Sequence, residues 1–405
     1  MLPHLEELDL SGNPLGEVDP ENLQDVKGLR ILRLSKCNLT HLHSVLYQQL
    51  PKLLELDLRD NSIYVLAPEE FRHLRSLKVL RLDGNKLANL EESTFQGHNF
   101  DYLGLSRNAI FNISPCAFCN STIRSLDISR NRLSGFNSAL QPISTGLRNL
   151  VCSYNRLDGS AISNAVRPLK ELQELDVSKN VVSFLSDDTF INNRHLKYLN
   201  LSFNQLDDLS QFVLQPVLSS LEEVDLSFNQ FPSFRVSTLE QLETIPRVHI
   251  FENVLSCTSC NMMAMLSWSN SSSLYNFTCE RYGCLYCKYP PYLASREIHT
   301  LAADELGSCT QPVTQSRVLV MTSQLGIIVG ASVAIVLFIV VILLISVYRR
   351  HGAVYYTHED ERTYNGMYEN LMAGAVNGYE DKPVFYTTLD RIEETGEEKS
   401  PFKHG

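Results

Sequence analysis

Cysteine offers the clearest chemistry in this chain, because six of the ten cysteines lie within one short segment that ends at residue 309. Two pairs in this segment have the Cys-x-x-Cys spacing and are separated by 23 residues. Thiols at this spacing can bind zinc when they are reduced, or form disulfides in an oxidising compartment. A zinc site would use four of the six and leave two unexplained, so their density favours disulfides. The six residues are Cys257, Cys260, Cys279, Cys284, Cys287 and Cys309.

Catalytic chemistry has little support in the sequence, which contains no HExxH motif, no phosphate-binding loop and no assignable Ser-His-Asp set or paired-carboxylate cleft. Four histidines fall in connecting segments, where we expect no metal-ligand partners for them. A net formal charge of −11 also argues against nucleic acid as a partner. The sequence therefore predicts a protein that is not an enzyme and holds no metal or cofactor. The four histidines are His41, His43, His73 and His98.

Tyrosines near the C-terminus indicate a second kind of chemistry, phosphorylation. Tyr364 begins Tyr-Asn-Gly-Met, which resembles the YxxM sequence that recruits lipid-kinase adaptors. Tyr368 begins Tyr-Glu-Asn-Leu, which resembles an adaptor-binding YxN sequence and an endocytic signal, and Tyr386 lies in a sequence that resembles an inhibitory immunoreceptor motif. A phosphate adds nearly two charges and three acceptors to a flexible segment. Phosphotyrosine-binding or endocytic adaptors are the expected partners, and sorting signals without phosphorylation are the alternative.

The apolar segment over residues 325–348 predicts on which side of a membrane the cysteines and tyrosines lie. It contains no charged residue and is long enough, at about 1.5 Å per residue, to span a hydrocarbon core of roughly 30 Å. We expect a single transmembrane helix, with a buried globular helix as the alternative. Arg349 and Arg350 follow directly, so the positive-inside rule places the C-terminus in the cytosol. Small residues recur at every fourth position and could bring two helices together, although they are common in such helices; they are Gly326, Gly330 and Ala334.

Glycosylation sequons agree with this orientation, because all six Asn-x-Ser/Thr sequons precede the apolar segment. The first residues of the chain, however, show neither the basic region nor the apolar core of a signal peptide. We therefore expect that upstream sequence is missing; translocation driven by the apolar segment itself is the alternative. The sequons are at Asn38, Asn112, Asn120, Asn200, Asn270 and Asn276.

The elements that position these groups are repeats. The pattern L-x-x-L-x-L-x-x-N-x-L occurs eleven times with steps of 23 to 25 residues, which predicts a solenoid. The L-x-L alternation buries one face of a short strand, and strands stacked about 4.8 Å apart would form one parallel sheet. An amide at each turn can satisfy backbone groups of that turn. The amide positions are Asn13, Cys37, Asn61, Asn85, Asn108, Asn131, Asn155, Asn180, Asn204, Asn229 and Asn253.

Other repeat positions are read as core. Cys37 replaces a ladder asparagine and Cys152 replaces a core leucine, so both are expected to be buried thiols. Cys116 and Cys119 could be a redox pair, but without a strand-to-helix redox context a structural loop disulfide is favoured. Five phenylalanines at similar offsets are expected to pack behind the sheet: Phe71, Phe95, Phe118, Phe190 and Phe212.

These units, followed by the cysteine-rich segment, resemble the extracellular leucine-rich repeat family over about three quarters of the chain. The resemblance implies an α/β solenoid, a horseshoe with a concave parallel sheet and a disulfide-rich C-terminal cap. One transmembrane helix and a disordered tail complete the expected architecture. The same horseshoe serves many ligands, so the resemblance is specific for fold and not for function. The expected parts are repeats over 1–256, the cap over 257–309, a stalk over 310–324, the transmembrane helix over 325–348 and a cytoplasmic tail over 349–405.

The family resemblance also implies how the cap is bonded. Cys287 begins a C-x-x-P-x-x-L sequence like that of the family cap, and Cys309 resembles its closing cysteine. Cys279 and Cys284 depart from the four-cysteine pattern and are expected to pair with each other. Zinc binding by the two Cys-x-x-Cys pairs stays open as the alternative. The pairs implied by analogy are Cys257 with Cys287 and Cys260 with Cys309.

The outward positions of the sheet are where a ligand would bind. In repeats one to four, opposite charges alternate at one site and could pair across strands, giving a self-neutralised face: Asp9, Arg33, Asp57 and Arg81. From repeat five onward, exposed aromatic and apolar residues are typical anchors for a protein partner: Tyr102, Val151, Tyr154, Tyr198, Phe203 and Phe228. The alternative is that the phenylalanines only cover strand ends. A glycan at Asn200 would lie on the same face.

Together these features predict a single-pass plasma-membrane protein that binds an extracellular protein ligand for adhesion or receptor signalling. Its N-terminus would be extracellular and its C-terminus cytoplasmic, and a dimer is possible through the helix. The alternative function is an innate-immune receptor or co-receptor that binds microbial molecules and signals through a partner, because the tail contains no signalling domain.

Overall fold

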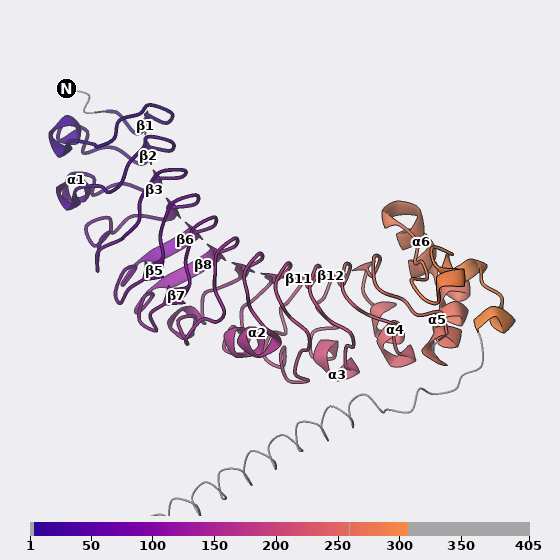
Figure 1. Ribbon diagram of the computed structural model, residues 1–405. Coiled ribbons are helices and arrows are strands. Elements are labelled where there is room, and N and C mark those ends of the chain that lie inside the picture. The colour runs from indigo at the N-terminus through magenta and orange to yellow at the C-terminus, as the bar shows by residue number, and fades with distance from the viewer. Residues whose placement is uncertain (1–3, 259, 307–405) are drawn as a thin grey trace, which may run out of the picture. The chain divides into compact units, whose positions relative to one another are not determined.

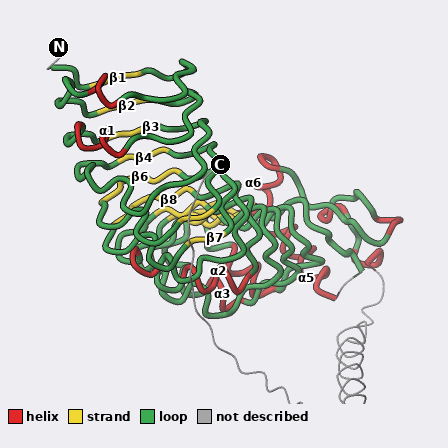
Figure 2. Tube along the Cα trace, turned by 60° about the vertical axis from the view of Figure 1, so that its left-hand side comes forward, coloured by secondary structure: helices red, strands yellow, loops and turns green. Residues whose placement is uncertain are grey.

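The computed structural model describes residues 4–258 and 260–306; the predicted stalk, transmembrane helix and tail lie outside these residues. Among the described residues, no helix combines the length and apolar character that crossing a membrane requires. The described part is a curved solenoid in which short strands stack along one face and connecting segments with short helices form the other (Figures 1 and 2).

One parallel sheet of eleven strands lines the concave face, with the strands in chain order. The register is constant, so that Leu8 lies opposite Leu32 and Leu175 opposite Leu199. Each strand is short because one buried residue between two outward ones is all that the L-x-L unit supplies. The strands are β1 (Glu7–Asp9), β2 (Ile31–Arg33), β3 (Glu55–Asp57), β4 (Val79–Arg81), β6 (Asn99–Gly104), β8 (Thr122–Asp127), β9 (Asn149–Val151), β10 (Glu174–Asp176), β11 (Tyr198–Asn200), β12 (Glu223–Asp225) and β13 (Arg247–His249).

The convex side carries short and varied elements. Its two-stranded sheet consists of β5 (Asn89–Leu90) and β7 (Asn112–Ile113). Its helices in the repeats are α1 (Ser44–Gln49), α2 (Gly159–Val166), α3 (Gln211–Leu214) and α4 (Val236–Leu242), with 3-10 turns η1 (Pro20–Leu23) and η2 (Gln141–Ile143). The cap contains α5 (Cys260–Ser271), α6 (Ser273–Tyr282), η3 (Pro291–Leu293), η4 (Ile298–Thr300) and η5 (Ala303–Leu306).

The core is a continuous filling of leucines and phenylalanines between the sheet and the convex segments. The rings of Phe71, Phe95 and Phe118 stack in series, with centroids 6.0 and 5.7 Å apart. The prediction that Phe212 belongs to this core is wrong, because its side chain is 50% exposed. It lies in the first turn of α3, where Val213 and Leu214 take the buried positions instead.

The asparagine ladder forms as predicted. Asn61 donates from Nδ2 to the carbonyl oxygens of Leu34 and Leu58, at 2.8 and 3.0 Å. Its Oδ1 accepts from the backbone N–H groups of Cys37 and Leu39, each at 3.0 Å. Each buried amide therefore joins its own turn to that of the preceding repeat, which satisfies backbone groups that water cannot reach.

Cys37 interrupts the ladder without leaving it open. Its buried thiol donates to the carbonyl oxygen of Leu10 at 3.2 Å, in place of an asparagine Nδ2. No amide oxygen is present there to accept from Leu15, whose N–H donates to the carbonyl oxygen of Asn13 at 2.8 Å. Cys152 is also a buried free thiol, and burial raises its pKa well above the ordinary value.

In the cap, α6 packs against the last strand, β13, and α5 packs against α4. Disulfides join Cys257 to Cys287 and Cys279 to Cys284. Three of the four cysteines in the two Cys-x-x-Cys pairs, Cys257, Cys284 and Cys287, are thus in disulfides, which favours the disulfide interpretation over zinc. The predicted pair of Cys260 with Cys309 lies outside the described residues, because Cys309 does. In the repeats, a disulfide joins Cys116 to Cys119.

Candidate functional site

Three of the predicted ligand-binding residues lie on strands of the concave sheet. Tyr102, Val151 and Tyr198 belong to β6, β9 and β11, where they alternate with buried leucines and are half-exposed. The Tyr198 hydroxyl donates to Glu222 at 3.2 Å, and Arg247 lies 5.7 Å from its ring centroid. These side chains form the floor of the concave surface.

The other three predicted residues lie at the edge of the sheet. Tyr154, Phe203 and Phe228 each immediately precede a ladder asparagine, at the point where the strand turns away. In every repeat the residue at this position has a left-handed backbone, with φ between 52 and 78°. Identical backbone geometry in successive repeats aims these side chains the same way, one strand spacing apart. The residues are Gly12, Lys36, Asp60, Gly84, Arg107, Arg130, Tyr154, Lys179, Phe203, Phe228 and Glu252.

Five consecutive members of this series touch one another, and we call them the edge row: Arg130, Tyr154, Lys179, Phe203 and Phe228. The guanidinium carbon of Arg130 lies 4.0 Å from the ring centroid of Tyr154. Lys179 Nζ lies between two rings, 4.5 Å from that of Tyr154 and 4.3 Å from that of Phe203. The Phe203 and Phe228 rings then stack face to face at 4.1 Å. Cation–π contacts and ring stacking therefore run without a break across five repeats.

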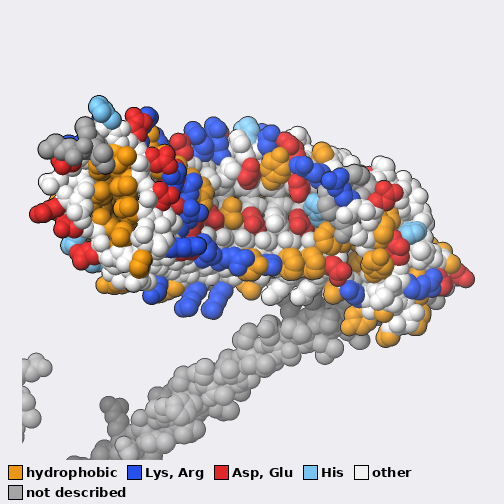
Figure 3. All heavy atoms as spheres, turned by 90° about the horizontal axis from the view of Figure 1, so that it is seen from above, with side chains coloured by type: hydrophobic (Ala, Val, Ile, Leu, Met, Phe, Trp, Pro, Cys, Tyr) orange, Lys and Arg blue, Asp and Glu red, His pale blue; other side chains and the backbone are white. Residues whose placement is uncertain are grey.

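The edge row is accessible as well as ordered. Tyr154, Phe203 and Phe228 are 38, 43 and 38% exposed. Lys179 Nζ also donates to the Tyr154 hydroxyl at 2.5 Å, and this hydrogen bond lowers the pKa of Tyr154. Figure 3 shows Lys/Arg and hydrophobic side chains alternating along one edge of the face seen from above. The predicted binding residues include the aromatic members and not Arg130 or Lys179, although the position before each ladder asparagine identifies all five.

Neighbouring residues continue the row at both ends. Phe251 meets the last ring edge-on at 5.6 Å, and Glu252 pairs with Lys288 of the cap at 3.5 Å. Toward the N-terminus, Arg107 pairs with Asp60 at 3.2 Å. The edge thus changes from charged pairs to aromatic rings and back to a charged pair at the cap.

The N-terminal half of the concave face is self-neutralised, but not by the predicted partners. Arg33 forms an ion pair with Glu7 and lies 4.0 Å from Glu55, which also pairs with Arg81 at 2.6 Å. These glutamates occupy the first outward position of their strands. The prediction that the arginines pair with Asp9 and Asp57 is therefore wrong.

The aspartates are engaged in their own turns. Asp57 accepts from the backbone N–H of Arg59 at 3.0 Å and pairs with its guanidinium at 2.6 Å. Asp9 accepts from the N–H of Ser11 at 2.9 Å. A carboxylate that accepts from the backbone N–H two residues later closes an Asx turn. The aspartates at this outward position therefore hydrogen-bond to their own backbone and not to the neighbouring strand. The same bond recurs at Asp127, Asp176, Asn200 and Asp225.

A buried carboxylate lies where the two halves meet. Asp83 accepts from the backbone N–H and hydroxyl of Ser106 at 2.9 and 2.8 Å, and burial raises its pKa. Gly104 makes room for it, because a Cβ there would lie 2.4 Å from Asp83 Oδ2. Burial, together with the charge of Asp83, raises the pKa of Tyr102 to about 12.

The predicted sequons lie on accessible surface to different degrees. Asn200 is half-exposed on β11, and its Oδ1 accepts from the N–H and hydroxyl of Ser202 at 3.0 and 2.7 Å. Asn112 is also half-exposed. Glycosylation itself stays a prediction. The exposed sequon residues are Asn38, Asn120, Asn270 and Asn276.

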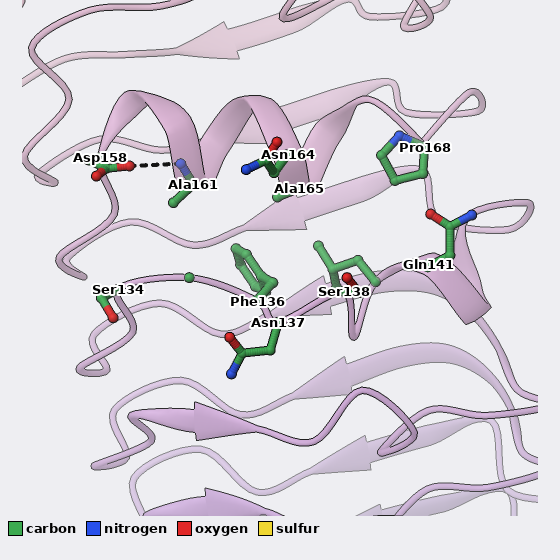
Figure 4. Close-up of a pocket in the computed structure, with 12 residues that line it drawn as sticks. Ser134, Phe136, Asn137, Ser138, Gln141, Asp158, Ala161, Asn164, Ala165 and Pro168 are labelled. Carbon is green, nitrogen blue, oxygen red and sulfur yellow. Dashed lines mark hydrogen bonds between the residues drawn. The ribbon is translucent and has the colours of Figure 1, made fainter.

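A hollow of about 560 Å³ lies away from this face, on the convex side beside α2 (Figure 4). Phe136 lies in its wall, and the polar groups around it are mostly uncharged. Its one carboxylate, Asp158, accepts from the N–H of Ala161 at 2.7 Å and so caps α2. This arrangement offers neither a nucleophile with a base nor a carboxylate pair.

Two of the four histidines, expected to have no metal-ligand partners, lie beside a carboxylate that could share an ion with them. His43 Nε2 lies 2.6 Å from Glu17 Oε1, and one ligand atom from each of Glu17, His41 and His43 lies within 4.8 Å of the others. Glu17 precedes His41 by 24 residues, which is one repeat, so the period could have revealed the pair. His98, by contrast, is buried, and burial lowers its pKa.

Comparison with known families identifies the repeats. Leucine-rich repeat models match residues 4–26, 27–87, 75–133, 145–206 and 170–231. Together these segments span 4–133 and 145–231, more than half of the 405 residues. This chain belongs to the leucine-rich repeat family.

Individual relatives match this chain over part of their length. Trophoblast glycoprotein of Macaca fascicularis is 26% identical over 205 residues, covering 50% of this chain and 47% of that protein. Toll-like receptor 3 of Boselaphus tragocamelus is 25% identical over 258 residues, covering 54% of this chain and 28% of that protein. The leucine-rich repeat protein FLRT2, solved in an octameric complex with Latrophilin 3 and Unc5D, superposes with a TM-score of 0.50 at 22% identity, over 75% of this chain and 91% of that chain. This likeness shows the fold. The chain spans less than half the length of the curated relatives it matches.

Proposed function

We propose that this chain is a single-pass cell-surface protein that binds a protein ligand on the C-terminal half of its concave face. The edge row is the observation that carries the proposal. Aromatic and arginine side chains dominate binding energy at protein interfaces. Four of them, held in contact with one another and with Lys179, form a pre-ordered surface that loses little side-chain entropy on binding. Relatives that are named as receptors, among them Toll-like receptor 3 and a brassinosteroid LRR receptor kinase, support a binding role.

The chemistry of the row indicates what the ligand presents. The ammonium of Lys179 and the guanidinium of Arg130 can each donate hydrogen bonds to a carboxylate while remaining over a ring. The stacked pair of Phe203 and Phe228 offers an apolar platform next to them. A ligand surface with acidic and apolar side chains one strand spacing apart would match both.

Ligand binding can be tested on cells that display the full-length chain. A panel of soluble extracellular domains is screened for binding, and the double variant Phe203→Ala, Phe228→Ala is compared with wild type. We expect at least about a tenfold loss of affinity, because removing interface anchors costs upwards of about 1.4 kcal/mol. Phe212→Ala is the matched control, since its side chain is also exposed, at 50%, and lies on the convex side. Unchanged binding by the double variant, at equal surface level, would refute this site.

The membrane topology rests on the sequence of residues 325–348 and on the sequons. An N-terminal tag should be stained on intact cells and a C-terminal tag only after permeabilisation. Digestion with a peptide-N-glycosidase should reduce the apparent mass. A tag order that is reversed, or a mass that does not change, contradicts the proposed topology or the proposed glycosylation respectively.

An innate-immune role is the second candidate, favoured by the similarity to Toll-like receptor 3. Binding of microbial glycolipids by the same displayed chain, in the absence of binding to any extracellular protein domain, would favour it. In either case we propose that Tyr364, Tyr368 and Tyr386 recruit cytosolic adaptors. Phenylalanine substitution of each tyrosine, followed by pull-down of phosphotyrosine-binding proteins, tests this step.

A further inference from the structure

The geometry points to a zinc-class metal site at the outer edge of the first two repeats, formed by Glu17, His41 and His43. One ligand atom from each residue lies within 4.8 Å of the other two. Two imidazoles and a carboxylate form a donor set that zinc uses in proteins, with a fourth position left for water or a further ligand. This site is independent of the proposed ligand-binding face.

The repeat architecture explains why the three side chains converge. Glu17 and His41 occupy the same position of successive repeats, four residues after the ladder position, so they lie side by side. His41 and His43 flank Leu42, which is buried, while both imidazoles are exposed. The two rings meet edge to face with centroids 5.3 Å apart. Both histidines are therefore turned away from the core, toward the glutamate of the neighbouring repeat.

The ligand-atom distances lie on either side of those in a small tetrahedral site. Zinc bonds of about 2.0–2.2 Å to nitrogen and oxygen place tetrahedral ligand atoms roughly 3.3 Å apart. His43 Nε2 and Glu17 Oε1 lie 2.6 Å apart, which is closer than this value, and the outer limit of 4.8 Å is wider. The side chains of His43 and Glu17 are 47 and 60% exposed. Small rotamer changes, which move each ligand atom by about 1 Å or less, can therefore bring the atoms to the tetrahedral spacing without clashing with the core.

A threonine hydroxyl beside His41 prepares that ligand for a metal. The hydroxyl of Thr40 lies 3.1 Å from Nδ1 of His41. When Nδ1–H donates to this hydroxyl, the tautomer is fixed and Nε2 carries the lone pair that a metal requires. An ion pair between His43 and Glu17 would explain the 2.6 Å contact alone, and would leave the approach of His41 without a role.

Similar groupings elsewhere in the described residues lack this donor set. Cys279, Cys284 and Glu297 also lie within 4.8 Å of one another, but both sulfurs are in a disulfide and cannot bind a metal as thiolates. His299 pairs with Glu297 at 2.9 Å, which gives one imidazole and one carboxylate.

A bound ion would link repeat 1, through Glu17, to repeat 2, through His41 and His43. In the described sheet β1 pairs with β2 alone, so repeat 1 is held by a single neighbour. Because metal binds the folded arrangement of the three ligands and not the dispersed one, occupancy would stabilise this edge of the array. The role inferred for the site is thus a structural clamp.

The test is a zinc titration of the purified full-length chain, in competition with a chromophoric chelator. We expect one tight equivalent of Zn²⁺ per chain in wild type. His41→Ala, His43→Ala and the isosteric Glu17→Gln should each weaken binding by at least about tenfold. His195→Ala is the matched control, an exposed histidine in a distant repeat, and should bind as wild type does. Mg²⁺ at the same concentration should not compete, since it prefers oxygen ligands.

Two readouts separate loss of the site from loss of the fold. Far-UV circular dichroism should be the same for Glu17→Gln and wild type. Co²⁺ in place of Zn²⁺ should give a visible ligand-field absorption that disappears in both histidine variants. The inference is overturned if wild type binds no zinc, or if His41→Ala and His43→Ala bind it as tightly as wild type; an ion pair alone would then account for the contact.

Discussion

The two halves of the concave face use one backbone for two different surfaces. In repeats one to four the outward arginines are paired with glutamates of neighbouring strands, as Arg33 is with Glu7 and Arg81 with Glu55. In repeats six to ten the edge row places cations against rings instead, with Lys179 between Tyr154 and Phe203. The parallel pairing of the strands and its register continue from one half to the other.

This difference shows which positions belong to the scaffold and which are available for binding. Ion pairs between neighbouring strands satisfy each other and leave little for a ligand to gain. Cations over rings keep most of their hydrogen-bonding capacity, and the ring-bearing side chains stay 38 to 43% exposed. A surface whose residues are ordered but not saturated is the better binding surface.

The ladder should show that the halves share one scaffold, and here we expect the largest effect. Asn61→Ala in the first half and Asn180→Ala in the second each leave several buried backbone groups unpaired. Each should lower the free energy of unfolding by about 2–4 kcal/mol, measured by urea denaturation. Asn164→Ala, at an exposed position on α2, should change it by less than about 0.5 kcal/mol. A large effect in one half only would contradict a common scaffold.

Lys179 and Lys36 sharpen the contrast, because both precede a ladder position with the same left-handed backbone. Lys179→Ala removes two cation–π contacts and a hydrogen bond, and should cost about 1 kcal/mol of stability. Lys36→Ala carries the same backbone change and should cost less than about 0.5 kcal/mol. Thermal unfolding of the two variants side by side measures the difference; equal losses would mean that the edge row contributes nothing to stability.

Asp83 marks the boundary and should respond to pH. Its raised pKa means that the folded chain holds this proton after the unfolded chain has released it. Raising the pH from the ordinary aspartate range through the raised pKa therefore lowers wild-type stability. Asp83→Asn keeps an acceptor for Ser106 and loses the charge, so its stability relative to wild type should grow across that window. Parallel pH profiles of the melting temperature would contradict the assignment.

The ion pairs of the first half should give the smallest effect. A double-mutant cycle on Arg81 and Glu55, both half-exposed, should yield about 0.2–1 kcal/mol of coupling. The coupling should shrink in high salt, because screening weakens partly exposed pairs. Coupling that is larger than this and indifferent to salt would show that the first half is more rigidly ordered than its contacts indicate.

Sequence alone predicted the solenoid, its concave sheet and the ladder, because these follow from a period that every repeat obeys. It misassigned side chains whose roles depend on local geometry. Asp57 was read as a cross-strand partner, yet its carboxylate closes its own turn. Phe212 was read as core, yet the start of α3 gives the inward positions to its neighbours.

The candidate site was predicted in part for a related reason. Hydrophobicity identified Tyr154, Phe203 and Phe228, whereas Arg130 and Lys179 look like ordinary surface charges until the backbone places them over rings. The convergence of Glu17 with His41 is likewise a relation between repeats, visible only when they are aligned. Pairwise relations across the period held information that single residues did not.

The left-handed position before each ladder residue has a practical consequence for engineering. Glycine adopts this backbone freely, whereas an L-residue is strained there by about 1–3 kcal/mol. Gly12 and Gly84 show that the turn accepts glycine. Phe203→Gly and Phe228→Gly would therefore delete recognition groups while relaxing the main chain beneath them. Variants that lose ligand binding but still fold and reach the cell surface can thus be made one residue at a time along this edge.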